Sequence, residues 1–125
     1  MTNHPAELWR TRLRTALLAA RKDRDAVRVS ALRSALSAID NAEAVPPATP
    51  VDAPSSGTIA GGVVGLGAAE AARRALSDEQ IRAVMRTEID ERETAAAEVA
   101  AGGHVRHAAT LREEAAVLSH LLGDV

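Results

Sequence analysis

Seven basic residues in the first third of the chain are the side chains best suited to bind a nucleic acid. Arginines on neighbouring helices contact phosphates without reading a base sequence. The chain has one tryptophan, Trp9, and no tyrosine or phenylalanine, which argues against stacking on single-stranded bases but leaves recognition of a folded RNA by its shape. The RNA-binding candidates are Arg10, Arg14, Arg21, Lys22, Arg24, Arg28 and Arg33.

The charge of the chain is unevenly divided. Its formal net charge is −2, yet residues 1–44 hold eight basic against five acidic residues, and residues 76–125 hold five against ten. Two interpretations follow: two helical hairpins pack with complementary charge at their rims, or a basic face meets an acidic partner such as RNA. Arg10, Arg14 and Arg21 lie four and seven residues apart, which places them on one solvated face of a helix.

Histidines near the start of the last predicted helix are the only candidates for metal binding. His104 and His107 lie three residues apart, with Glu114 and His120 further along. A metal site needs three or four converging ligands, so we interpret these histidines as solvent-facing and expect no metal.

Neither carboxylates nor hydroxyls form a recognisable catalytic set. The acidic residues from Glu88 to Glu93 alternate with arginines, which is typical of a solvated, salt-bridged surface. Ser30, Ser34 and Ser37 offer hydroxyls, but no pattern of histidine and aspartate would activate them. We therefore predict no catalytic residue in this chain.

A glycine-rich run from Gly61 to Gly67 resembles a phosphate-binding loop only superficially. Successive glycines ahead of a helix can form a nest of N–H groups. A dinucleotide-binding fold needs a preceding strand within a βαβ unit, and a Walker loop needs a following Gly-Lys-Ser/Thr. Because these signals are missing from the sequence, we interpret the run as a flexible linker and expect no cofactor.

Two helical hairpins are expected to position these side chains. Residues 5–44 form the first: Pro5 suits a first helical turn, a helix extends to about residue 21, and Asp23 or Asp25 caps a second helix. Residues 76–122 form the second hairpin. There, Ser77 with Gln80 makes a capping box, and Gly102 followed by a second glycine ends the helix.

Between the hairpins lies an insert, residues 45–75, that is rich in proline and glycine. Pro46 and Pro47 end the preceding helix, and residues 68–76 are predicted to form a short helix. The whole chain, residues 1–125, is expected to be a single all-α domain: an up-down bundle of about four principal helices in two α-hairpins.

The composition limits the remaining classes of protein. With so few aromatic residues, the core must be built from leucine, isoleucine, valine and many alanines. The chain has no cysteine, no apolar run of membrane-spanning length and no visible secretory signal, so we expect a cytoplasmic protein without disulfides or a membrane partner.

Short blocks along the chain resemble the YqeY family, small helical proteins related to the C-terminal region of the GatB amidotransferase subunit. The resemblance lies in the order and spacing of these blocks together. They are Ala31-Leu32-Arg33, Ala38-Ile39-Asp40-Asn41-Ala42-Glu43, Leu76-Ser77-Asp78-Glu79-Gln80-Ile81, the segment from Glu88 to Glu93, Ala101-Gly102, and Arg112-Glu113-Glu114 with Leu118.

This resemblance implies an all-helical fold and an association with glutamine-dependent tRNA amidotransferases, which are carbon–nitrogen ligases that use glutamine as amido-N-donor. In those enzymes other domains carry out catalysis. The expected function is therefore a non-catalytic helical module that binds tRNA or an amidotransferase complex. Family members usually continue into a second small helical domain, which we expect this chain, ending at Val125, to lack. The alternative is a protein-interaction or self-association module without an RNA role, whose partner would include a second copy of the chain.

Overall fold

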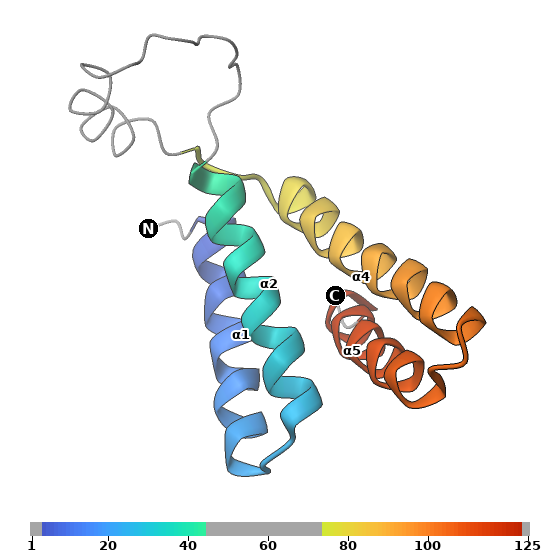
Figure 1. Ribbon diagram of the computed structural model, residues 1–125. Coiled ribbons are helices and arrows are strands. Elements are labelled where there is room, and N and C mark those ends of the chain that lie inside the picture. Colours follow the sequence, from blue (N-terminus) through green and yellow to red (C-terminus); the bar gives the residue numbers. More distant parts are fainter. Residues whose placement is uncertain (1–3, 45–73, 124–125) are drawn as a thin grey trace, which may run out of the picture.

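The computed structural model describes residues 4–44 and 74–123, and this part of the chain is all-α (Figure 1). Its four helices are α1 (Pro5–Lys22), α2 (Ala26–Ala44), α4 (Asp78–Ala101) and α5 (Val105–Gly123). Each neighbouring pair forms an antiparallel hairpin, which confirms the predicted bundle of two α-hairpins. None of the helices in these residues combines the length and apolar character that crossing a membrane requires.

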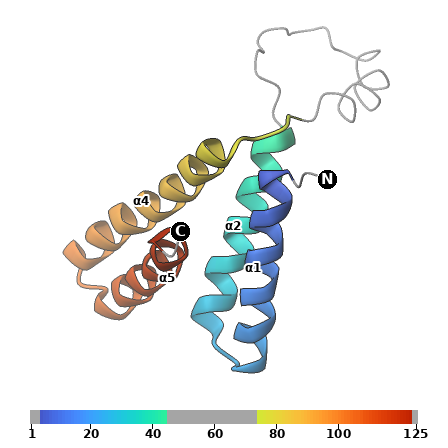
Figure 2. The same ribbon diagram turned by 180° about the vertical axis from the view of Figure 1, so that it is seen from behind.

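The two hairpins share one end and diverge toward the other. In Figures 1 and 2, α4 starts beside the C-terminal end of α2, and the turns that close the two hairpins lie far apart. The insert lies outside the described residues up to position 73, but Arg74 to Leu76 are not helical, so the predicted short helix does not reach residue 76. Instead, the Arg74 amide donates to the Glu43 carbonyl (2.9 Å), and Leu76 is buried.

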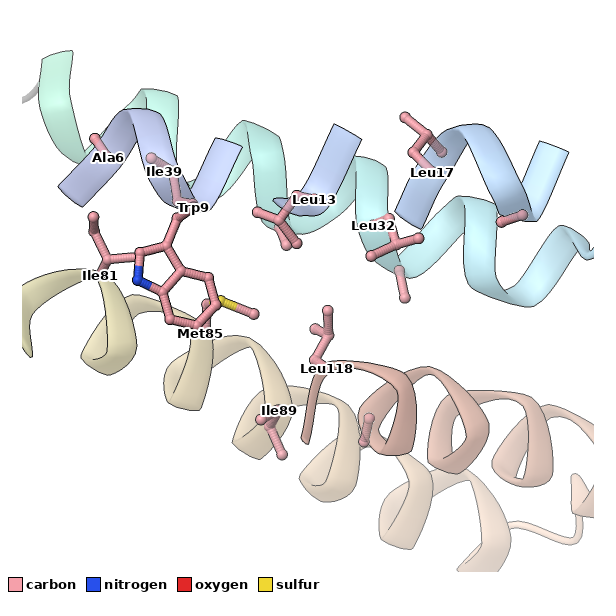
Figure 3. Packing of buried hydrophobic residues seen from close by; sticks show 14 of the residues in the cluster. Ala6, Trp9, Leu13, Leu17, Leu32, Ile39, Ile81, Met85, Ile89 and Leu118 are labelled. Atoms are coloured by element: carbon pink, nitrogen blue, oxygen red, sulfur yellow. The ribbon is translucent and has the colours of Figure 1, made fainter. Parts of the chain in front are cut away.

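The core follows the predicted helical spacing. On α1, Trp9, Leu13 and Leu17 are buried, and on α4 of the opposite hairpin Ile81 and Met85 lie beside Trp9 (Figure 3). The remaining buried positions are mostly alanines, such as Ala20, Ala31, Ala35, Ala96, Ala108 and Ala115. Small side chains let the helix backbones approach closely, which is how a chain with one aromatic residue fills its core.

Trp9 connects the two hairpins. Its indole Nε1 donates to Asp78 Oδ1 (2.8 Å) at the start of α4, and Arg82 Nε donates to the other oxygen of the same carboxylate (2.7 Å). The guanidinium carbons of Arg12 and Arg82 lie 4.5 and 5.3 Å from the ring centroid. Arg12 also donates to the Leu121 carbonyl (3.2 Å), and this hydrogen bond connects the last turn of α5 to α1.

The α1–α2 turn is a Schellman motif that ends on a left-handed arginine. The Asp25 amide donates to the Ala20 carbonyl, the Arg24 amide donates to the Arg21 carbonyl, and Arg24 has φ of 56°. The Asp25 side chain then accepts from the Arg28 amide (3.1 Å), which identifies Asp25 as the cap of α2.

The α4–α5 turn has the same hydrogen-bond pattern but a glycine at the left-handed position. The His104 amide donates to the Val99 carbonyl and the Gly103 amide to the Ala100 carbonyl, with Gly103 at φ of 91°. At the other end of α4, both hydrogen bonds of the predicted Ser77–Gln80 capping box are present, at 2.9 and 3.1 Å. The capping signals in the second hairpin are therefore confirmed.

The two turns make a matched test of backbone strain. A left-handed backbone conformation costs a residue with a Cβ about 1–2 kcal/mol. Glycine avoids this cost but loses more backbone entropy on folding, which offsets part of the gain. Arg24→Gly should therefore raise the free energy of unfolding in urea by about 0.5–1 kcal/mol. Gly103→Arg should lower it by a similar amount. An Arg24→Gly variant less stable than the parent would contradict this account.

Asp78 should make folding sensitive to acid. Its hydrogen bonds from Arg82 and from Trp9 lower the pKa of its carboxyl group in the folded state. A lowered folded-state pKa contributes stability that is present above the unfolded pKa of about 3.9 and is lost as the pH falls through the folded value. Asp78→Asn should therefore flatten the loss of stability below about pH 4, measured by the fluorescence of Trp9, the single tryptophan. If Asp78→Asn loses stability below about pH 4 as steeply as the parent, Asp78 is not the cause of the acid sensitivity.

Candidate anion-binding groove on the first hairpin

A shallow groove, widely open to solvent, lies beside the α1–α2 turn of the first hairpin. The C-terminal end of α1, the turn and one face of α2 form its walls. Three arginines and three serines supply all of its polar side chains, and two apolar residues complete it. The lining residues are Arg21, Arg24, Ala26, Val29, Ser30, Arg33, Ser34 and Ser37.

Helical periodicity explains why these side chains gather. Ser30, Arg33 and Ser37 are spaced three and four residues apart, so they follow one face of α2. The buried residues of the same helix, such as Leu32 and Ile39, lie on the opposite face and pack against the core. The groove face is therefore free to carry polar groups at no cost to the core.

Within the described residues the groove is positively charged without internal compensation. No acidic side chain lines it, and Arg21, Arg24 and Arg33 are exposed and form no ion pair with a described residue. Guanidinium groups and hydroxyls that are not already bonded can donate to an incoming anion. The groove thus has the chemistry of an anion site, and it holds three of the seven predicted RNA-binding residues.

Arg10 does not belong to a solvated face, which corrects the sequence-based interpretation. Its side chain is only 15% exposed and forms ion pairs with Asp40 (2.7 Å) and with Glu43 on α2. The hydrogen bond to Glu43 raises the pKa of Arg10 despite the opposing effect of burial, so the guanidinium stays charged. Arg10 holds the two helices together and is not placed to meet an external phosphate.

The other basic candidates divide in a similar way. Arg28 pairs with Asp23 (3.1 Å) and lies 3.8 Å from Asp25, so its charge is used within the α1–α2 turn. Arg14 and Lys22 are exposed but do not line the groove.

Serines 30, 34 and 37 are the part of the groove that sequence reasoning missed. In the sequence these serines are considered only as nucleophiles, and no histidine or aspartate is found to activate them. The other polar side chains that line the groove are arginines. The sequence did contain a pattern that indicates this role. The three hydroxyls follow helical spacing around Arg33, on the face of α2 opposite its apolar stripe. Ser30, Ser34 and Ser37 are placed to donate hydrogen bonds to a ligand in the groove.

None of the ion pairs found between described residues connects one hairpin to the other. Arg92 bonds Glu88 and Glu114, both at 3.0 Å, and so links α4 to α5 within the second hairpin. The other pairs likewise connect residues of one hairpin. Complementary charge at the rims therefore does not extend to direct pairing, although Arg12 lies close enough to Asp78 to contribute to its lowered pKa.

The two predicted solvent-facing histidines lie at the start of α5. His104 directly precedes α5, His107 lies in its first turn, and both are exposed. Among residues 4–44 and 74–123, no group of three potential metal ligands is found.

Comparisons with known proteins do not assign this chain to a family. No family model, no curated protein and no solved structure matches it. The resemblance to YqeY proteins therefore stays a prediction.

Arg10 should matter for folding far more than its exposed neighbour. Removing the guanidinium takes away the cation that pairs with the largely buried Glu43 carboxylate, so Arg10→Gln should lower the free energy of unfolding by about 2 kcal/mol. The same change at exposed Arg14 should cost less than about 0.5 kcal/mol. Urea unfolding of the two variants gives the comparison, and equal effects would remove the structural role assigned to Arg10.

Proposed function

We propose that the chain is a non-catalytic helical module that binds a folded RNA through its phosphate backbone. The observation that carries the proposal is the shallow groove, which Arg21, Arg24 and Arg33 line together with three serines and no acidic side chain. The formal charge of the chain is −2, so the attraction is local to this groove and not a property of the whole surface.

The buried state of Trp9 favours backbone contacts over base stacking. Trp9 is only 2% exposed, and Arg12 and Arg82 lie over its ring, so too little of the ring is accessible for a base to stack on. An aromatic platform is what proteins use to bind single strands through their bases. A groove of guanidinium and hydroxyl donors suits phosphate oxygens instead, and these contacts position an RNA without reading its sequence.

The resemblance to YqeY proteins makes tRNA the first RNA to test, alone or within a glutamine-dependent amidotransferase complex. In this proposal the module holds the RNA, while any carbon–nitrogen ligase chemistry belongs to a partner. The absence of any acid or base other than arginine among the groove residues supports a binding role.

Binding to tRNA should be strongly salt-dependent. About three neutralised phosphates predict a slope near −2 to −3 in log K against log salt, or a roughly thirtyfold loss of affinity from about 50 to 200 mM salt. Arg21→Gln and Arg33→Gln should each reduce the slope by about one. Fluorescence anisotropy with labelled tRNA measures both effects.

Arg112 on α5 provides the matched control, because it is exposed and lies outside the groove. Arg112→Gln removes the same charge and should leave the salt slope unchanged. Arg24→Gly should weaken binding although it stabilises the fold, which separates a lost contact from a damaged protein. Salt-independent binding, or equal losses for Arg33→Gln and Arg112→Gln, would refute the proposal.

A further inference from the structure

The outer face of α1 carries a stripe of uncharged residues that points away from the core. Leu8, Thr11, Thr15 and Leu18 are spaced three, four and three residues apart, so they lie on one side of the helix. All four are exposed, and the two leucines, at 50% and 58% exposure, are among the few large apolar side chains that the described residues leave in solvent. The buried side chains of α1, including Leu13, lie on the opposite side.

The ends of this stripe carry opposite charges. Glu7 lies at its N-terminal end, and Lys22, which continues the same spacing four residues beyond Leu18, lies at its C-terminal end. Two such helices side by side in antiparallel order bring Glu7 of each copy toward Lys22 of the other, and their macrodipoles also attract. In parallel order the like charges would meet.

A hollow beside Leu8 offers a place for an apolar side chain. It lies between α1 and the start of α4, and its surface is mostly apolar although Arg12, Asp78 and Arg82 form part of the lining. Its lining residues are Pro5, Leu8, Trp9, Thr11, Arg12, Asp78 and Arg82. The hollow and the exposed Leu18 therefore lie at opposite ends of the same stripe.

We propose that two copies of the chain associate through α1, antiparallel, with Leu18 of each copy seated against Leu8 and the hollow of the other. Leu8 and Leu18 are ten residues apart, about 15 Å along the helix, so a two-fold axis near the middle of α1 makes both contacts at once. Thr11 of one copy then lies near Thr15 of the other. The surface pairs with itself, which is what a closed dimer requires.

The contact is small, so the dimer should be weak. One face of a five-turn helix is well below the roughly 800 Å² per partner of a stable complex, which predicts dissociation constants in the range of about 10 μM to 1 mM. The face lies apart from the groove that carries the proposed RNA binding, because no residue of the stripe lines that groove. A variant that loses dimerisation should therefore still bind RNA, and a variant that loses RNA binding should still dimerise.

Sedimentation equilibrium over about 10 μM to 1 mM protein tests the association. The parent chain should move from monomer toward dimer across this range, and Leu18→Glu should shift the midpoint at least tenfold upward. Val105→Glu is the matched control, since Val105 is 72% exposed on α5 and outside the stripe, and it should dimerise like the parent. A parent that is monomeric at all concentrations, or equal effects of the two glutamates, would overturn the proposal.

Cysteine cross-linking tests whether the two α1 helices pack antiparallel, and it does so without a substitution that disrupts the contact. The chain has no cysteine of its own, so Leu8→Cys and Leu18→Cys each give a single reactive thiol. Under mild oxidation a mixture of the two variants should form the mixed disulfide several times faster than either variant alone forms its own. Preferential cross-linking within each single variant would indicate parallel helices and contradict the antiparallel dimer, as would equal rates in all three samples.

Discussion

The indole of Trp9 is the contact on which the arrangement of the two hairpins depends. It leaves α1, lies beside Ile81 and Met85 on α4, and donates to Asp78 at the start of that helix (Figure 3). A single large side chain placed where the hairpins meet supplies both apolar area and a directional hydrogen bond. Further from this junction, alanines and short aliphatic side chains suffice.

A core of small residues also shapes the surface. Because only three to five residues of each helix are buried, and several of these are alanines, most positions on a helix remain at least partly in solvent. Charge is then used in two distinct ways. Arg10 and Arg92 form ion pairs that link the two helices of a hairpin, and Arg28 forms its ion pairs within the α1–α2 turn. Arg21, Arg24 and Arg33 form no ion pair with another described residue, and these three line the groove.

Local signals made the helices and their ends predictable. Pro5, the Ser77–Gln80 box and Gly102 act within a few residues, and the structure places each of them as the sequence indicates. The role of Arg10 was not predictable in this way, since its partners Asp40 and Glu43 become neighbours only when α2 folds back on α1. The groove has the same origin: Arg21 and Arg24 precede α2 and meet its serines only through the turn.

Arg24 links the fold to the proposed binding role. The two hairpins close with the same hydrogen-bond motif, and at the equivalent left-handed position the second hairpin has Gly103. A glycine would close the first turn with less strain, so folding alone does not account for an arginine there. Strained backbone positions concentrate where a side chain serves another purpose, and the side chain of Arg24 lines the groove beside Arg21 and Arg33. The proposed anion-binding role would explain why the turn tolerates this cost.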